Sequence, residues 1–137
     1  MIPAMTVREL VEKICELKGW EKRARTSMSA WMIEIPQPRG RKQDMVVTGF
    51  KDGASPMVRF TTVVGSQEKL DATRVRTALE LNSKLPHGCL ALEEGNLILT
   101  GTRPLDTTTP ATSAAAIAFL AGQADMYERL IYGADEN

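Results

Sequence analysis

The sequence is poor in the residues from which many active sites and cofactor sites are built. It has one histidine and two cysteines in 137 residues, and aromatic residues make up 5% of it. A structural zinc site takes four Cys or His ligands, which His87 and the widely separated Cys15 and Cys89 do not supply. Both cysteines lie on apolar stretches without the spacing of a redox motif, so we expect reduced thiols in the core. The sequence therefore predicts no metal ion and no other cofactor.

An excess of one charge and long apolar runs are also absent. The 17 Lys and Arg balance 17 Asp and Glu, although residues 1–60 carry 11 basic against 7 acidic side chains (+4) and the rest 6 against 10 (−4). A dedicated nucleic-acid binder concentrates more positive charge on one face, so we do not expect nucleic acid as the main partner. No apolar run approaches the roughly 18 residues of a membrane span, and residues 1–6 lack a secretory signal pattern. We expect a soluble, cytoplasmic protein without a membrane partner.

The composition fits one ordinary globular domain. Hydrophobic residues make up 43% of the chain and charged residues 25%, which excludes a disordered or collagen-like chain. A chain of this length buries roughly two-thirds of its unfolded surface, enough for one hydrophobic core. There is no internal repeat and no linker long enough to divide it. We therefore treat residues 1–137 as a single domain.

The first half predicts a helix followed by three strands. Thr6 and Glu9 form a capping box before apolar residues at helical spacing, and Gly19 is a natural stop. After a charged stretch at residues 21–25, to which we assign no strand, the apolar residues alternate over residues 28–35. Residues 43–50 and 57–64 predict two more strands. The short loops between them favour an antiparallel meander.

The second half predicts a helix, a hairpin and a closing helix. Asp71 is a suitable N-cap for a helix that ends near Pro86. Residues 89–93 and 97–102 flank a short turn-rich connection and predict a hairpin. Thr109 and Pro110 then begin a helix that runs to about Tyr132. The fold class is α+β, with an antiparallel sheet of about five strands, three helices and the order α-β-β-β-α-β-β-α.

The sequence contains no pattern of catalytic residues. His87 and Cys89 are two positions apart on an extended chain, which leaves their side chains roughly 6.5 to 7 Å apart and out of hydrogen-bond contact. The glycines lack the spacing of a nucleotide-binding loop. Helix capping explains the threonines of residues 106–109 more simply than an anion site does. We expect a protein that is not an enzyme and that functions by binding.

Two kinds of surface are candidates for that binding. Arg39, Arg41 and Lys42 form a basic loop that suits an acidic partner, although a solvated loop is the simpler interpretation. The predicted sheet also leaves edges and an incompletely covered face, which can accept an extended segment or an amphipathic helix. Several aromatic and methionine side chains suit such a surface, while for each of them singly the core is the favoured location. They are Trp31, Met32, Met45, Met57 and Phe60.

The second half of the sequence contains a characteristic series of short motifs. They are the stretch Leu79-Glu80-Leu81-Asn82, then Gly88, the alternating Leu90, Leu92, Leu97 and Leu99, and Pro104-Leu105 before a long helix. With the order of elements, these features resemble the fold of the class I type III secretion chaperones and of the related YbjN-like proteins. The resemblance covers nearly the whole chain.

This resemblance implies a homodimer that holds an unfolded segment of a partner polypeptide, such as a secreted effector. The implied partner-binding residues are Leu10, Ile14, Leu17, Trp31, Ile33 and Ile35. The implied dimer contacts are Val75, Ala78 and Leu79. The alternative is a YbjN-like regulatory protein that binds a ligand, nucleic acid or another partner without a role in secretion.

Overall fold

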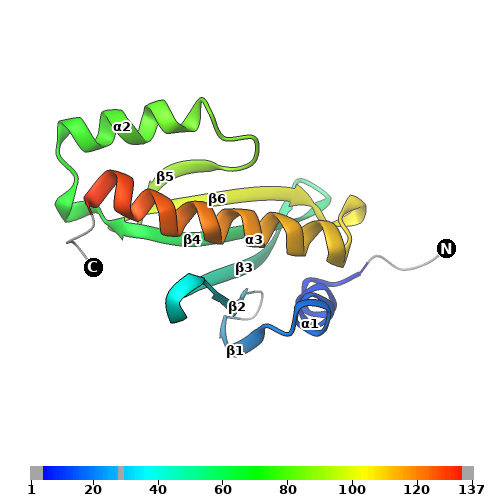
Figure 1. The fold of residues 1–137 in the computed structure, drawn as a ribbon. Helices are drawn as coiled ribbons and strands as arrows, with labels where there is room; N and C mark the ends of the chain where they lie inside the picture. Colours follow the sequence, from blue (N-terminus) through cyan, green and yellow to red (C-terminus); the bar gives the residue numbers. More distant parts are fainter. Residues whose placement is uncertain (1–4, 28–29, 134–137) are drawn as a thin grey trace.

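The computed structural model describes residues 5–27 and 30–133, which form three α-helices and one six-stranded antiparallel sheet (Figure 1). The helices are α1 (Val7–Lys18), α2 (Ala72–Asn82) and α3 (Pro110–Tyr127). The strands are β1 (Glu21–Ser27), β2 (Ala30–Pro36), β3 (Lys42–Asp52), β4 (Ser55–Ser66), β5 (Cys89–Glu93) and β6 (Asn96–Pro104). The predicted α+β class is confirmed, and the predicted order of elements fits apart from one additional strand. The first predicted strand began at residues 28–29, which lie outside the described residues.

The predicted strand count is wrong, because the charged residues 21–25 belong to β1. The strand has the sequence EKRARTS, without the alternation of apolar and polar residues that marks a half-buried strand. It lies at the sheet edge and pairs with β2 through its backbone, with a bulge between Arg23 and Ser27. Glu21, Lys22 and Arg23 are exposed. Charge and a bulge are common devices for protecting an edge strand from further pairing.

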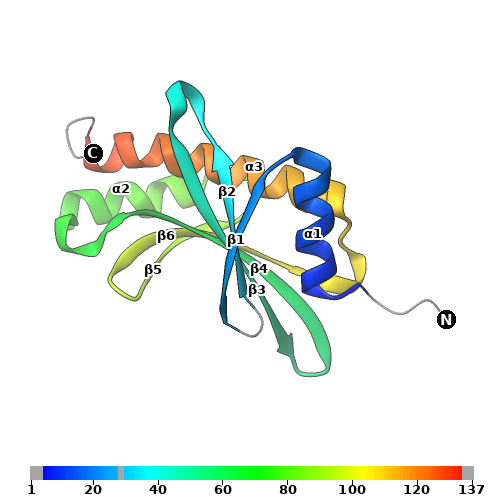
Figure 2. The same cartoon turned by 90° about the horizontal axis from the view of Figure 1, so that it is seen from below.

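The sheet order is β1-β2-β3-β4-β6-β5, so β1 and β5 form its two edges. Helices α1 and α3 contact each other and pack on one face, where α3 crosses β3, β4 and β6 (Figures 1 and 2). Helix α2 lies beside the end of α3 and contacts β5 at the edge. The helices therefore cover one face of a twisted two-layer structure.

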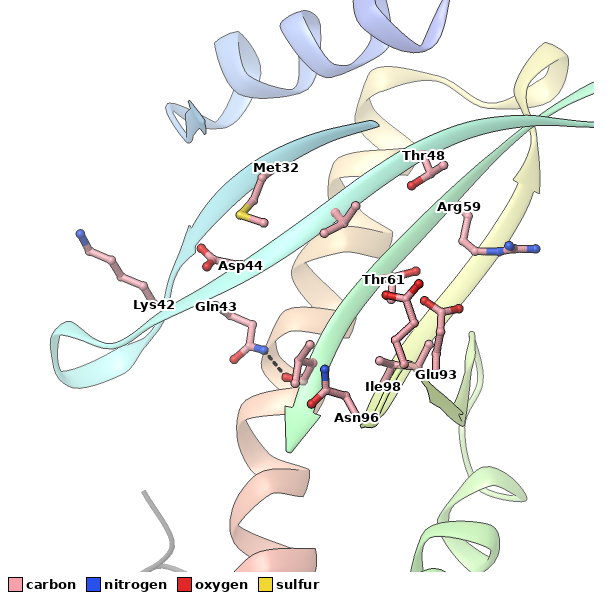
Figure 3. A pocket seen from close by; sticks show the side chains of 13 residues that line it. Met32, Lys42, Gln43, Asp44, Thr48, Arg59, Thr61, Glu93, Asn96 and Ile98 are labelled. Carbon is pink, nitrogen blue, oxygen red and sulfur yellow. Dashed lines mark hydrogen bonds between the residues drawn. The ribbon is translucent and has the colours of Figure 1, made fainter. Parts of the chain in front are cut away.

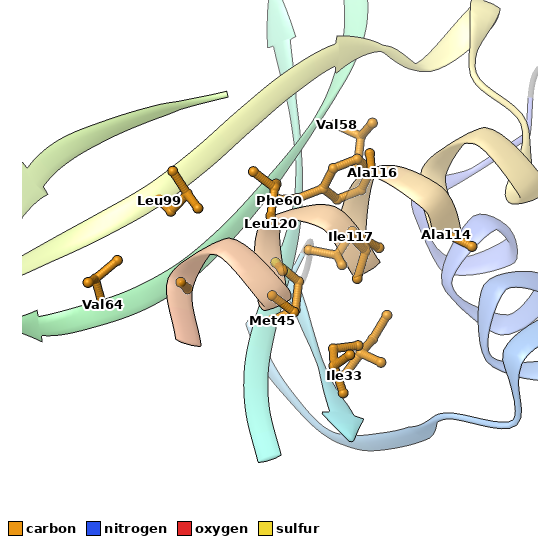
Figure 4. Packing of buried hydrophobic residues seen from close by; sticks show 14 of the residues in the cluster. Ile33, Met45, Val58, Phe60, Val64, Leu99, Ala114, Ala116, Ile117 and Leu120 are labelled. Atoms are coloured by element: carbon orange, nitrogen blue, oxygen red, sulfur yellow. The ribbon is translucent and has the colours of Figure 1, made fainter. Parts of the chain in front are cut away.

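The core lies between this face and the helices. Phe60 of β4 is buried against the α3 side chains Ile117 and Leu120 (Figure 4). The α3 side chains Ile117, Leu120 and Tyr127 are buried, and Ala114 and Ala116 allow α3 to approach the sheet closely. Burying one large apolar side chain contributes roughly 1.5 to 3 kcal/mol, so this layer is the main source of stability.

Local capping chemistry places the ends of the elements. The capping box of Thr6 and Glu9 begins α1, and Gly19 ends it with φ 70°. Asp71 caps α2, which ends at Asn82, earlier than expected. The β5–β6 turn has positive φ at Glu94 (49°) and Gly95 (82°), as a two-residue hairpin turn requires. These predicted signals are confirmed, while α3 changes at its end into a π turn, η4 (Glu128–Tyr132).

Candidate binding surfaces

The sheet face opposite α1 and α3 carries a hollow of about 630 Å³ (Figure 3). Side chains on strands alternate between faces, so residues next to core positions point into it. Met32 of β2, Val46 of β3 and Ile98 of β6 contribute apolar side chains to its lining. The complete lining is Met32, Lys42, Gln43, Asp44, Val46, Thr48, Arg59, Thr61, Val63, Glu93, Glu94, Asn96 and Ile98.

The polar side chains in the middle of this face are held by their neighbours. Thr61 and Thr100 share a hydroxyl hydrogen bond of 3.0 Å across β4 and β6. Arg59 donates to Thr102 Oγ1 at 3.1 Å, and its guanidinium lies 4.4 Å from the centre of the Phe50 ring. These contacts fix the side chains before anything binds. The surface is therefore preorganised.

The β2–β3 end of the hollow is a network of ionic groups. Glu34 is buried on the open face, where Lys42 Nζ lies 2.9 Å from its carboxylate and Arg23 donates to the other oxygen. The hydrogen bonds from Lys42 and Arg23 lower the pKa of Glu34 below its ordinary value. The same contact with Glu34 raises the pKa of Lys42. Glu34 is therefore ionised and satisfied within the chain.

The opposite end of the hollow carries unpaired negative charge. Glu93 and Glu94 lie at the turn between β5 and β6, and both are exposed. Neither forms an ion pair with any described residue. This end of the face is therefore able to receive a cationic group.

Two of the three basic side chains of the predicted loop form ion pairs within the protein. Arg41 makes a two-pronged contact with the buried Asp125 of α3, with Nε–Oδ1 and Nη2–Oδ2 distances of 3.0 and 2.7 Å. Lys42 pairs with Glu34. Arg39, with φ 65°, remains exposed. The loop fastens the β2–β3 hairpin to α3 more than it presents charge to a partner.

Most of the predicted partner-binding residues form the core. Leu10, Ile14, Trp31, Ile33 and Ile35 are all buried, and together they join α1 to the helix-covered side of β2. A partner cannot reach them in the folded chain. Leu17 differs, since 57% of its surface is exposed at the end of α1.

The open face was only partly found from the sequence. Of the side chains considered for such a surface, Met32 lines the hollow, whereas Met45 and Phe60 are buried in the core. Other residues of the open face, such as Val46 and Thr61, could have been found because they alternate with the core residues along each strand.

The predicted dimer residues lie along a second, apolar groove between α2 and β5. Val75 and Leu79 are 38% and 65% exposed, whereas Ala78 is buried beneath them. Leu92 of β5 lies across the groove and is 52% exposed. The groove has a volume of about 140 Å³, and the remaining lining is Leu70, Asn82, Leu90, Ala91 and Leu97. The structure thus brings two of the three predicted residues to one surface.

Neither surface carries a cluster of metal-binding side chains among the described residues. Within residues 5–27 and 30–133, no three His, Cys, Asp or Glu side chains gather to hold a metal ion. Cys15 is half-buried, and burial raises the pKa of its thiol. Cys89 is exposed, contrary to the prediction of a core thiol, because β5 is an edge strand whose odd-numbered side chains face away from the helices.

No protein-family model matches the chain, and no curated protein is significantly similar to it. None of the helices in the described ranges is both long and apolar enough to cross a membrane.

Proposed function

We propose that the chain is a polypeptide-binding module of the type III secretion chaperone kind, which works as a homodimer and holds an extended segment of a partner polypeptide on the open sheet face. The observation that carries this proposal is the large preorganised hollow on a sheet face that α1 and α3 leave uncovered. The resemblance in the order of elements implies a secreted effector as the partner.

The lining of the hollow suits an extended segment. Met32, Val46 and Ile98 offer contacts to apolar side chains. The Thr48 hydroxyl can pair with a backbone amide or carbonyl, and Thr61, whose proton goes to Thr100, can accept from a backbone amide. The unpaired Glu93 and Glu94 favour a basic residue at one end of the segment. The occupant is therefore an apolar segment that carries Lys or Arg on the side of the β5–β6 turn.

The homodimer is proposed at the groove between α2 and β5. Strand β5 is an edge of the sheet. Backbone groups of every second residue in a strand point to the same side, so the N–H and C=O of Leu92 point away from β6, as those of Leu90 do. Exposed Leu79 and Leu92 lie beside these backbone groups. A two-fold-related second copy offers the same edge and the same leucines, which makes the contact self-complementary.

The regulatory alternative depended on the basic loop as a binding surface. Since Arg41 pairs with Asp125 and Lys42 with Glu34, that loop offers little free charge.

A random peptide library displayed on phage tests the proposal, because it offers the open face segments of every composition. Selection on the wild-type protein, with counter-selection on the V46E/I98E variant, should enrich apolar peptides containing Lys or Arg. Nuclear magnetic resonance titration should then place their shifts at Met32, Val46, Thr61 and Ile98. The E93Q/E94Q variant should bind them more weakly, with a smaller dependence on salt.

The control is L17E, which places one glutamate on an exposed leucine of α1, away from the open face. It should bind the selected peptides like the wild type. Failure to enrich any peptide, or equal binding to V46E/I98E, contradicts the proposal.

A further inference from the structure

A second hollow lies on the helix-covered face, where the loop before β5 meets β6 and the first half of α3. Two adjoining cavities of about 340 and 330 Å³ share His87, Arg103 and Ala116 in their linings. Figure 4 shows Ala116 and Leu120 of α3 close to Phe60 of β4, at the base of this region. The site is separate from both surfaces described above.

The hollow exists because the chain places very small residues there. Strand β5 begins at Cys89, opposite Thr100, so the rest of β6 has no strand on that side. Gly88 turns there with φ 74°, and a Cβ would lie 2.7 Å from the Thr100 carbonyl oxygen. Residue 88 must therefore be glycine for the loop to pack this closely on β6, while Gly101 and Ala116 project little side chain into the hollow.

Arg103 gives the cleft its charge. No Asp or Glu lines either cavity. Arg103 is half-buried and forms no ion pair or hydrogen bond with any residue that the structure describes. A partly buried guanidinium is stabilised by an anion, and its planar donors match a carboxylate in two-pronged geometry.

The walls beside Arg103 are apolar and aromatic. The His87 ring meets the Phe119 ring edge to face, with centroids 5.7 Å apart and planes at 88°. This contact holds the imidazole at the mouth of the cleft. Phe60, Ala116 and Leu120 line the interior. The cleft thus combines one cationic group with an apolar enclosure.

We propose that this cleft binds a small organic carboxylate, with Arg103 on the carboxylate and the apolar body of the ligand against Ala116 and Leu120. The ligand's charge satisfies the unpaired guanidinium, and its body fills the space beside Gly101 and Ala116. This proposal does not depend on the polypeptide-binding function.

Phenylacetate is a suitable probe, with its neutral isostere phenylacetamide and inorganic phosphate as comparisons. In nuclear magnetic resonance titrations of the full chain, phenylacetate should shift the signals of His87, Gly101, Arg103 and Phe119 saturably. Phenylacetamide and phosphate should each bind at least about tenfold more weakly, since each lacks one half of the interaction. Equal binding of phenylacetamide, or of phosphate, overturns the assignment.

Two Arg103 variants and a matched control complete the test. R103Q should weaken phenylacetate binding at least about tenfold, and R103K should fall between R103Q and the wild type because lysine keeps the charge but loses the planar fork. R76Q, which removes an exposed arginine from α2, should leave binding unchanged. Unfolding curves of each variant report whether it is folded. Saturable shifts that persist unchanged in folded R103Q overturn the proposal.

Discussion

The side-chain amide of Asn82, in the last turn of α2, pairs with both backbone groups of Leu90 on the edge strand β5. Asn82 Oδ1 accepts from the Leu90 N–H at 2.6 Å, and Nδ2 donates to the Leu90 carbonyl at 3.1 Å. The amide thus acts as one further residue of a neighbouring strand. It closes this part of the edge and leaves Leu92 as the next position available for pairing.

Replacing Asn82 tests how much its hydrogen bonds to Leu90 stabilise the fold. Asn82→Ala leaves both Leu90 groups unpaired, and we expect it to lower the free energy of unfolding by about 1 to 3 kcal/mol. Asn82→Asp retains an acceptor but loses the donor to the carbonyl, so it should also destabilise. Urea unfolding measures the effect, and hydrogen exchange at the Leu90 amide should accelerate. Ser83→Ala removes only an exposed hydrogen bond, and a loss as large as that of Asn82→Ala would contradict this account.

Charge placed in the α2–β5 groove should dissociate the proposed dimer. The wild-type chain should show twice its monomer mass of 15.1 kDa in light scattering. Leu79→Asp and Leu92→Asp each put a carboxylate into the apolar contact, so both should shift the mass to the monomer. Leu17→Asp alters a comparably exposed leucine on α1 and should leave the dimer intact. A wild-type monomer at high concentration rules out the dimer.

Gly65 and Tyr132 should be coupled in stability. A Cβ at residue 65 would lie 2.4 Å from Tyr132 Cε2. The ring cannot easily move aside, because its hydroxyl donates to the Ser66 carbonyl at 2.8 Å. We therefore expect Gly65→Ala to cost roughly 1 to 3 kcal/mol in unfolding free energy.

Tyr132→Phe removes only the hydroxyl, and its cost should be smaller, about 0.5 to 1.5 kcal/mol. In a Tyr132→Ala background, Gly65→Ala should cost much less than in the wild type, since the clashing ring is gone. Urea unfolding of all four proteins gives this double-mutant cycle. Additive effects of the two changes would show that the ring is not the obstacle.

Features fixed by neighbouring residues could be predicted, and those fixed by distant residues could not. The Thr6 cap of α1 and the turn at Glu94 and Gly95 depend on side chains and φ angles within four residues. Strand β1 has no such signal, because its pairing partner β2 supplies the backbone hydrogen bonds. Arg41 looked like a free charge because Asp125 is 84 residues away in the chain.

The candidate surfaces had the same limitation. Periodicity places Leu10, Ile14 and Leu17 on one side of α1, but it does not say how far α3 extends over that side. The first two are buried and Leu17 is exposed. Similarly, the packing of α2 against β5 buries Ala78 and leaves Leu79 exposed. Which apolar side chains form a surface is decided by the packing of whole elements.

The Glu34 network should make stability depend on acid pH. The pKa of Glu34 is lowered below its ordinary value of 4.5 by the hydrogen bonds from Lys42 and Arg23. A carboxyl whose pKa is lower in the folded chain stabilises the fold above the unfolded value, and that contribution is lost as pH falls through the folded pKa. Glu34→Gln, which cannot ionise, should therefore be less stable than the wild type at about pH 7, with the difference shrinking as the pH falls below 4.5. Urea unfolding across this pH range measures the difference.

Glu16→Gln, at an exposed position of α1, is the control and should follow the wild type closely. A difference between Glu34→Gln and the wild type that stays constant with pH would mean that Glu34 contributes through shape rather than charge.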